Sequence, residues 1–171
     1  MRGKRETLPL REAERQAERI LKQLKKFPEV EKALVAGSVR RRKTKVRDID
    51  LVVESSLPEK IISEFVKMKL VGQVLASGKV EARVLTKKGI QVDLRVFNHN
   101  SFGSGLMHCT GSKPHNIWLR SIAKKKGMKL NEWGLFDSRE RQIAGKTERG
   151  VYALLGFKFV KPERRENEIK K

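Results

Sequence analysis

The feature that most constrains this chain is a pair of short apolar runs separated by a polar motif. The first run, residues 33–36, has the composition of a strand and ends at Gly37-Ser38-Val39-Arg40-Arg41; the second opens with Asp48-Ile49-Asp50. The Gly-Ser pair favours a tight turn, because glycine tolerates any backbone twist. On the strand that follows, residues two apart point the same way, so Asp48 and Asp50 share one face while the intervening apolar residues face the core.

Two carboxylates held side by side repel each other unless a proton or a cation lies between them. An Asp-x-Asp pair on an exposed strand is usually only solvated, but composition argues against that interpretation here. Only four of the 20 acidic residues are Asp, and three of these, Asp48, Asp50 and Asp93, fall on predicted strands, where Asp is unfavourable. Beside a turn with free backbone amides and two arginines, the pair predicts a site for a metal-chelated polyphosphate, that is, a nucleotide site.

The charge of the chain restricts its partners. The 171 residues carry a formal net charge of +20, and the excess is spread over both halves of the sequence. A field of this sign suits a polyanion, with nucleic acid the first candidate and an anionic membrane surface the second. A single cysteine excludes an internal disulfide and leaves no zinc ligand set. With no apolar run near ~20 residues and no signal peptide, we expect a soluble intracellular protein without a membrane partner.

Hydrophobic periodicity predicts an α+β fold. Strands are expected at 33–37, 48–53, 71–76, 80–85 and 90–96, and a short strand pair at 129–136; helices are expected at 9–27, 58–66, 113–126 and 147–155. The residues Thr86-Lys87-Lys88-Gly89 predict a hairpin turn before the strand that carries Asp93. If that strand lies beside Asp48–Val53, three carboxylates converge in a cluster suited to Mg²⁺ or Mn²⁺. The alternative is a surface pair between Asp93 and Arg95, which contributes little.

The region after the sheet predicts a second, smaller unit. Residues 98–105 are polar and rich in glycine, which favours a connection between domains. Ser112 is a candidate cap for the helix that follows, on which Asn116 and Arg120 share a face and Ile117 and Ile122 are expected in the core. The Lys124–Lys126 run is either a solvated helix end, favoured by the helix dipole, or a phosphate contact, and we favour the phosphate contact.

Taken together, these motifs resemble the family X DNA polymerases over essentially the whole chain from Leu8 onward. Gly-Ser with Asp-x-Asp is typical of the wider nucleotidyltransferase superfamily. Thr-Gly-Ser with a downstream Asn and Arg narrows the resemblance to the polymerase family. The motifs, in chain order, are Gly37-Ser38-x-Arg40-Arg41, Asp48-x-Asp50, Val92-Asp93-Leu94-Arg95, Thr110-Gly111-Ser112-Lys113-x-His115-Asn116, Leu130-Asn131-Glu132-x-Gly134-Leu135-Phe136, and Leu155-Gly156-Phe157 through Pro162-Glu163-x-Arg165-Glu166-Asn167.

The resemblance implies a nucleotidyltransferase-type palm, a mixed sheet with flanking helices, in residues 1–97, and a small α/β thumb in residues 98–171. It implies a DNA-directed polymerase that adds dNTPs to a primer 3′-hydroxyl by two-metal-ion catalysis with Mg²⁺ or Mn²⁺, and fills short gaps in DNA repair as a monomer. Asp48 and Asp50 would bridge the two ions, and Asp93 would complete the site and accept the proton of the hydroxyl.

The resemblance also assigns residues that contact the substrates. Ser38 and Arg41 would hold the triphosphate, Arg40 would support them, and Arg95 would steady Asp93. The expected nucleotide-binding residues are Gly37, Ser38, Arg40, Arg41, His108, Cys109, Gly111 and Asn116. The residues expected to contact or support gapped or primer–template DNA are Arg95, Lys113, Arg120, Lys124 and Lys125.

The chain departs from larger family members in two ways. It shows no lyase, helix-hairpin-helix or phosphoesterase region, so we expect a minimal palm-plus-thumb layout in which the basic surface holds DNA with a steep salt dependence. Cys109 stands where an aromatic residue is common in the family, which leaves room near the sugar and predicts weak exclusion of ribonucleotides. A template-independent nucleotidyltransferase and a non-catalytic DNA-binding module remain the alternatives.

Overall fold

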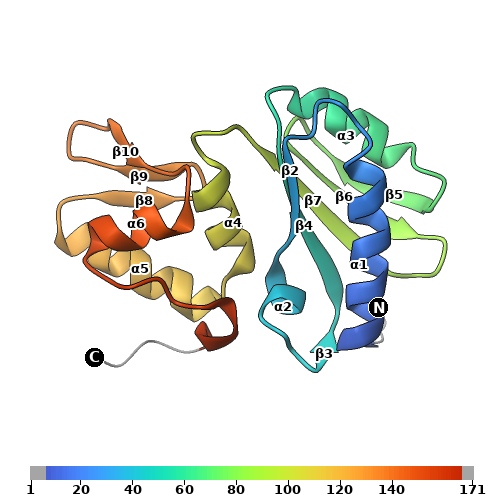
Figure 1. Ribbon diagram of the computed structural model, residues 1–171, viewed down its shortest axis with the longest axis horizontal. Helices are drawn as coiled ribbons and strands as arrows, with labels where there is room; N and C mark the ends of the chain where they lie inside the picture. Colours follow the sequence, from blue (N-terminus) through green and yellow to red (C-terminus); the bar gives the residue numbers. More distant parts are fainter. Residues whose placement is uncertain (1–6, 167–171) are drawn as a thin grey trace.

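The computed structural model describes residues 7–166, which form two lobes (Figure 1). The motif residue Asn167 and the basic pair Lys170-Lys171 lie outside the described residues. Within residues 7–166, no helix has the length and apolar character needed to cross a membrane.

The N-terminal lobe is built on a five-stranded sheet with the order β2-β4-β7-β6-β5. Its strands are β2 (Lys32–Val35), β4 (Asp48–Glu54), β5 (Val71–Ser77), β6 (Glu81–Thr86) and β7 (Gln91–Phe97). The pairing of β4 with β7 is parallel and the other pairings are antiparallel, so the sheet is mixed. A separate two-residue ladder joins β1 (Leu8–Pro9) to β3 (Lys45–Val46).

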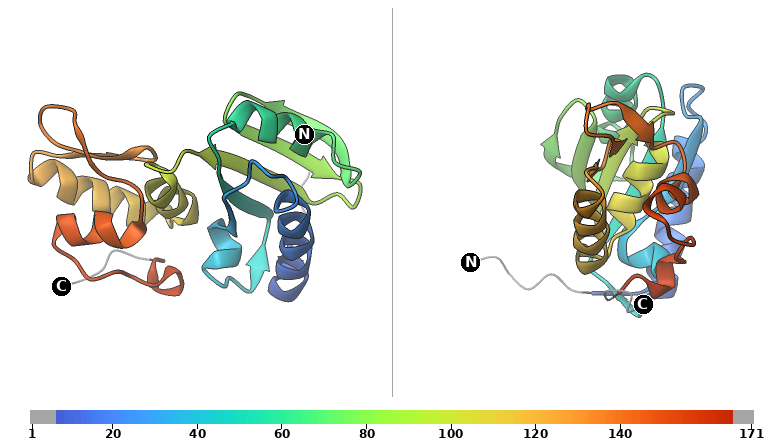
Figure 2. Two further views of the ribbon diagram at one scale, coloured as in Figure 1. Left: turned by 45° about the horizontal axis from the view of Figure 1, so that its top comes forward. Right: turned by 90° about the vertical axis from the view of Figure 1, so that its left-hand side faces the viewer.

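Two amphipathic helices, α1 (Leu10–Leu24) and α3 (Pro58–Val66), pack on one face of this sheet. Their apolar stripes join the inward-facing side chains of the strands in one core, which includes Ile20, Ile49 and Phe65. The other face of the sheet is turned toward the C-terminal lobe (Figures 1 and 2). The alternation predicted for β4 and β7 is thus confirmed: Ile49, Leu51, Val92 and Leu94 are buried, and the aspartates lie on the opposite face.

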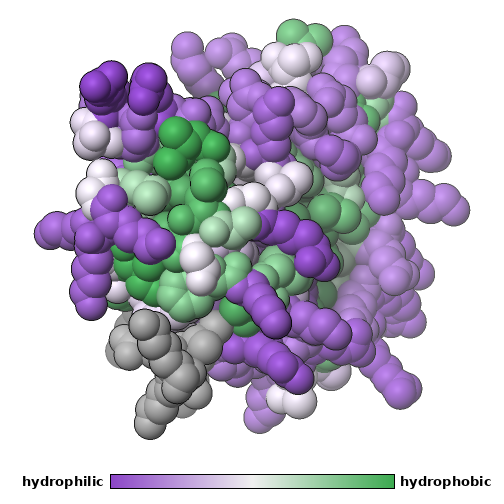
Figure 3. Space-filling view, turned by 60° about the vertical axis from the view of Figure 1, so that its left-hand side comes forward, coloured by the Kyte–Doolittle hydropathy of each residue, from purple (hydrophilic) through white to green (hydrophobic). Residues whose placement is uncertain are grey.

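The C-terminal lobe combines three helices with a small antiparallel sheet of order β10-β9-β8. The elements are α4 (Phe102–Thr110), α5 (Lys113–Lys125), β8 (Lys129–Asn131), β9 (Gly134–Phe136), β10 (Gln142–Ala144), α6 (Glu148–Leu155) and the 3₁₀ turn η1 (Pro162–Arg164). The predicted cap is present, since the Ser112 side chain accepts a hydrogen bond from the His115 amide. Thr147 caps α6 in the same way, and Gly156 ends it in the left-handed conformation. An apolar area is visible among charged side chains on this lobe (Figure 3).

The prediction that residues 98–105 form a connection between domains is wrong for the second half of this range. Helix α4 begins within it, and most of this helix is buried between the two lobes. A Cβ at Gly103 would lie 2.3 Å from the Thr147 Cα, and a Cβ at Gly105 would lie 2.5 Å from the Phe97 ring. These glycines therefore serve close packing and not flexibility.

Two smaller expectations also fail. Ile117 is 49% exposed, because α5 buries the stripe His115, Leu119 and Ala123 instead. The Gly37-Ser38 pair does not form an isolated turn but opens a one-turn helix, α2 (Gly37–Arg40). The consequence of this helix for the neighbouring carboxylates is described below.

Candidate active site between the two lobes

The three aspartates singled out in the sequence come together on two adjacent strands. Because β4 runs parallel to β7 in register, Asp50 lies directly opposite Asp93, and Asp48 lies one step along the same face. The buried apolar residues between them fix this orientation, since a shift by one residue would turn every side chain to the other face. The predicted convergence is therefore confirmed as geometry.

Gly37 makes room for this cluster. Its backbone has φ +57°, and a Cβ placed on it would lie 1.7 Å from Asp50 Oδ2. No side chain fits there, and the conformation itself favours glycine. The Ala36 amide donates to the Asp50 carbonyl at 2.8 Å, which ties α2 to β4. The glycine of the Gly-Ser motif is thus required by the approach of a carboxylate.

The electrostatics of the cluster favour a cation. Burial and the charges of Asp48 and Asp93 together raise the pKa of Asp50 to about 7, against the opposing effect of Arg41 and Arg95. A cation between the carboxylates would relieve this repulsion. The donors are all carboxylate oxygens, the ligands that Mg²⁺ and Mn²⁺ prefer. The residues present therefore fit the divalent metal that the sequence predicts.

A hollow of about 420 Å³ opens beside the cluster and takes its walls from both lobes. Its lining is Gly37, Ser38, Arg41, Asp48 and Asp50 from the N-terminal lobe, and His108, Cys109, Thr110, Gly111, Lys113, Asn116 and Arg120 from the C-terminal lobe. Seven of the eight predicted nucleotide-binding residues thus line one space. The exception is Arg40.

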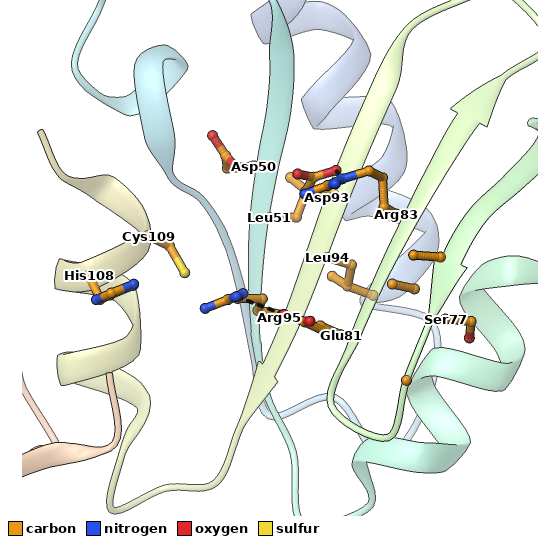
Figure 4. A pocket seen from close by; sticks show the side chains of 13 residues that line it. Asp50, Leu51, Ser77, Glu81, Arg83, Asp93, Leu94, Arg95, His108 and Cys109 are labelled. Atoms are coloured by element: carbon orange, nitrogen blue, oxygen red, sulfur yellow. Dashed lines mark hydrogen bonds and ion pairs between the residues drawn. The ribbon is translucent and has the colours of Figure 1, made fainter. Parts of the chain in front are cut away.

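A second hollow of about 480 Å³ continues along the exposed face of β6 and β7 (Figure 4). It shares Asp50, His108 and Cys109 with the first, and adds Asp93, Arg95 and Arg83. Burial lowers the pKa of His108 and raises the pKa of the Cys109 thiol to about 12. Both side chains are therefore neutral near pH 7, and Cys109 is a poor nucleophile.

The predicted support of Asp93 by Arg95 is wrong. Arg83 Nε donates to Asp93 Oδ1 at 2.9 Å, while Arg95 pairs with Glu81 at 2.7 Å. The strand register gives the reason: Arg83 lies directly opposite Asp93, and Glu81 lies opposite Arg95. Side chains directly opposite across two strands approach more closely than side chains two apart on one strand.

Arg40 also has a different place from the one predicted. Its guanidinium lines neither hollow. It donates to Glu148 Oε2 at 2.6 Å and Oε1 at 3.0 Å, and to Thr110 Oγ1 at 2.7 Å. Arg165, which is fully buried, donates to the same Glu148 carboxylate at 2.8 Å. Burial alone would raise the pKa of Glu148, but the hydrogen bond from Arg40 and the charge of Arg165 outweigh it and lower the pKa. Arg40, Glu148 and Arg165, called here the interlobe cluster, tie α2 to α6 and to the C-terminal segment.

Arg41 remains at the edge of the first hollow, where Glu166 is its partner. Arg41 Nε donates to Glu166 Oε1 at 2.8 Å, and its Nη1 donates to the Thr110 carbonyl. Lys43 pairs with the other oxygen of Glu166 at 2.7 Å. Two cations thus converge at the rim of the hollow on a single carboxylate.

The predicted DNA-contacting residues divide into two groups. Lys113 and Arg120 line the first hollow, and Arg95 lines the second. Lys124 and Lys125 are exposed in the last turn of α5, outside both hollows. Asn116 Nδ2 donates to the His108 carbonyl at 2.8 Å, which joins the start of α5 to the end of α4.

Two partners in this region were missed in the sequence. Arg83 was predictable, because closing the hairpin with Thr86 opposite Ile90 places Arg83 opposite Asp93. Glu148 was not, since no local pattern distinguishes it from the other glutamates. A further group, Glu31, Glu54 and His99, also converges, but buried Glu54 is already paired with Lys32 and His99, each at 2.6 Å.

Comparisons with known proteins agree with this geometry. The family model for the DNA polymerase beta thumb matches residues 105–166. A DNA polymerase/3′-5′ exonuclease PolX of Bacillus subtilis is 32% identical over 165 residues, which are 95% of this chain and 29% of that protein. A repair DNA polymerase X of African swine fever virus (strain Badajoz 1971) is 30% identical over 141 residues, covering 77% of this chain and 80% of the viral protein.

The fold is also that of a solved polymerase. A ternary P/T complex of Leishmania infantum polymerase beta superimposes with a TM-score of 0.84 at 22% identity, covering 94% of this chain and 77% of that one. The chain spans less than a third of the Bacillus relative and most of the viral one. On the residues, the fold and these relatives, the chain belongs to the family X DNA polymerases.

Proposed function

We propose that this protein is a DNA polymerase that adds a deoxynucleotide to a primer 3′-hydroxyl and fills short gaps in DNA repair. Residues 1–97 would act as the palm and residues 98–171 as the thumb. The observation that carries the proposal is the convergence of Asp48, Asp50 and Asp93 at a hollow walled by both lobes. The named activities of the Bacillus and viral relatives support it.

The reaction assigns a role to each carboxylate. Asp93 accepts the proton of the primer 3′-hydroxyl, and the oxygen of that hydroxyl forms a bond to the α-phosphorus of the dNTP. The bond between the α-phosphorus and the oxygen that bridges it to the β-phosphorus breaks, and pyrophosphate leaves. Asp48, Asp50 and Asp93 would hold two divalent cations, Mg²⁺ or Mn²⁺. When bound, these cations supply charge stabilisation to the attacking and leaving oxygens. In this chemistry, positioning and charge neutralisation provide most of the catalysis.

The first hollow offers donors for the triphosphate. Ser38 Oγ is buried without a hydrogen-bond partner among the described residues, so it is available to a phosphate oxygen. Arg41 can exchange Glu166 for a phosphate, because a guanidinium recognises both groups in the same geometry. From the opposite wall, Asn116 and Arg120 would face the nascent base pair.

The basic surface would hold the DNA. The two matching Leishmania infantum polymerase beta structures are a ternary primer–template complex and a ternary gap complex. Lys113, Lys124 and Lys125 extend the positive charge along α5, from the first hollow to the last turn of the helix. We expect affinity to fall steeply with salt, since each phosphate contact releases counterions.

The test is primer extension on a duplex with a one-nucleotide gap, with each dNTP offered separately in Mg²⁺ or Mn²⁺. Templated addition by the wild-type protein, lost in Asp93→Ala, is the expected result. Addition that ignores the template would indicate a template-independent nucleotidyltransferase instead. No addition with either metal, together with retained DNA binding, would leave a non-catalytic binding module.

A further inference from the structure

Arg83 is the cross-strand partner of Asp93, and it covers one specific oxygen of that carboxylate. Its Nε donates to Asp93 Oδ1 at 2.9 Å (Figure 4). Gln91 Nε2 donates to the same oxygen at 3.0 Å. The ion pair bridges β6 and β7 in register, at the wall of the second hollow. One oxygen of the proposed proton acceptor is therefore occupied by protein donors.

Asp50, which lies directly opposite Asp93, has a different environment. Asp50 has Arg41 and Arg95 only as neighbouring charges, and those guanidiniums form their ion pairs with Glu166 and Glu81. Arg83 thus directly neutralises part of the charge of Asp93. It is also only half-buried, with 52% of its side chain exposed, so it can swing into solvent without leaving a buried charge behind.

We propose that Arg83 is a positioning residue that acts through Asp93 as a stand-in counter-ion, which a divalent cation must displace from Oδ1. This inference rests on the proposed metal-dependent function of the same site. The competition has a defined sign: Arg83 orients Asp93 while the site is empty of metal, and it weakens the first approach of a cation. Removal of Arg83 therefore tightens metal binding, whereas removal of Asp93 weakens it.

The size of the effect follows from the geometry. A guanidinium within hydrogen-bond distance of a ligand oxygen lies close to the position of an incoming divalent ion. In a partly solvated groove, loss of that repulsion corresponds to about a three- to tenfold change in affinity. Arg83→Lys keeps the positive charge, so this variant should bind the divalent cation nearly as weakly as the wild-type protein does.

The experiment measures Mn²⁺ binding to the protein without DNA or nucleotide, from the free Mn²⁺ signal in electron paramagnetic resonance. The matched control is Arg141→Gln, because Arg141 forms the same kind of exposed pair with Asp137 at 2.8 Å and carries the same charge. Arg83→Gln is expected to bind Mn²⁺ about three- to tenfold more tightly than wild type. Arg83→Lys and Arg141→Gln should stay near wild type, and Asp93→Asn should bind more weakly.

Unchanged or weaker Mn²⁺ binding by Arg83→Gln would overturn the inference, as would equal tightening in Arg141→Gln or the absence of binding in every variant. These outcomes are independent of polymerase activity. Tighter binding by Arg83→Gln in a protein that adds no nucleotide would contradict only the proposed function. Templated addition by wild type with unchanged Mn²⁺ binding in Arg83→Gln would contradict only the role of Arg83.

Discussion

The carboxylate cluster of the site and the interlobe cluster differ in the balance between carboxylates and arginines. At the interlobe cluster, a single carboxylate, Glu148, receives hydrogen bonds from two arginines, and its pKa is lowered. At the site, three aspartates lie on one face of the neighbouring strands β4 and β7, and the pKa of Asp50 is raised to about 7. The charge of Glu148 is compensated by arginines of the protein, whereas the three aspartates repel one another unless a proton or a cation from outside lies between them. The presence or absence of compensating arginines thus distinguishes the interlobe cluster, which is structural, from the cluster proposed to be functional.

Among substitutions in the two clusters, we expect the largest change in stability at Glu148. Glu148→Gln leaves Arg40 and the fully buried Arg165 without their counter-ion, which is expected to cost about 3–5 kcal/mol of unfolding free energy. Urea denaturation of the purified variant measures it. Asp137→Asn, which removes the carboxylate of an exposed pair in the same lobe, should cost about 1 kcal/mol or less. Equal losses in the two variants would contradict the structural role of Glu148.

A pH dependence of stability is expected at His115, which lies beside the interlobe cluster. Burial, with the charge of Arg165, lowers the pKa of His115 to about 4, and its Nε2 contacts the Tyr152 hydroxyl at 2.6 Å. Below its ordinary pKa of 6.5 the unfolded chain gains a proton that the folded chain does not. Stability should therefore fall as the pH drops from about 6.5 to about 4, by up to about 3 kcal/mol.

Unfolding curves at successive pH values test this dependence of stability on pH. His115→Gln should flatten the curve of stability against pH, while His99→Gln, at an exposed histidine, should retain the wild-type curve. The contribution of Glu148 belongs to a lower window, because its pKa is lowered and its stabilisation is lost only as the pH falls below its ordinary range. A slope that persists in His115→Gln between pH 6.5 and 4.5 would assign it to other groups.

At the candidate active site, removal of one carboxylate charge should change stability in the opposite direction. Asp50→Asn removes a charge that burial and two neighbouring carboxylates disfavour, so the metal-free variant should be more stable than wild type by about 1–2 kcal/mol above pH 7. The gain should shrink as the pH falls, because a raised pKa means that wild-type Asp50 takes up a proton and loses the penalty. Denaturation at pH 8 and pH 5 measures both values. Destabilisation at pH 8 would show that the charge is already compensated within the protein.

The smallest expected effect concerns the wall that faces the carboxylates. Cys109 lines both hollows, and under the proposed function its small side chain would leave room beside the incoming sugar. We expect comparable efficiencies for dNTP and rNTP addition by wild type, and about tenfold better exclusion of rNTPs in Cys109→Phe. Steady-state incorporation of each matched pair tests it. Wild-type discrimination above about a thousandfold would contradict the expectation.

The sequence predicted the sheet and the carboxylate cluster because both depend on short periodic patterns. Alternation along β4 and β7 placed Asp50 and Asp93 on one face, and the hairpin before β7 fixed its neighbour. Helix α4 was not predicted because its glycines resemble those of a linker. The packing of Gly103 on Thr147 and of Gly105 on Phe97, which only the structure shows, explains them.

Arg40 shows the limit of reasoning from a motif. It is adjacent to Arg41 in the sequence, yet one turn of helix directs it to Glu148, which is 108 positions away in the chain. The residues near Arg40 in the sequence do not predict a contact over this distance in the chain. The motif correctly brought Gly37, Ser38 and Arg41 to one hollow, but the role of each arginine depended on which lobe it faces.

The most direct test of the central claim is templated addition by Asp50→Asn, a variant that changes the charge of the cluster with almost no change in shape. Wild type and variant are compared on the one-nucleotide gap with saturating Mg²⁺, after denaturation has shown that the variant is folded. The account predicts that wild type adds the templated nucleotide and that Asp50→Asn, although at least as stable, is slower by about a thousandfold or more. Addition by the variant within about tenfold of wild type would contradict the claim that this charge imbalance is the catalytic site.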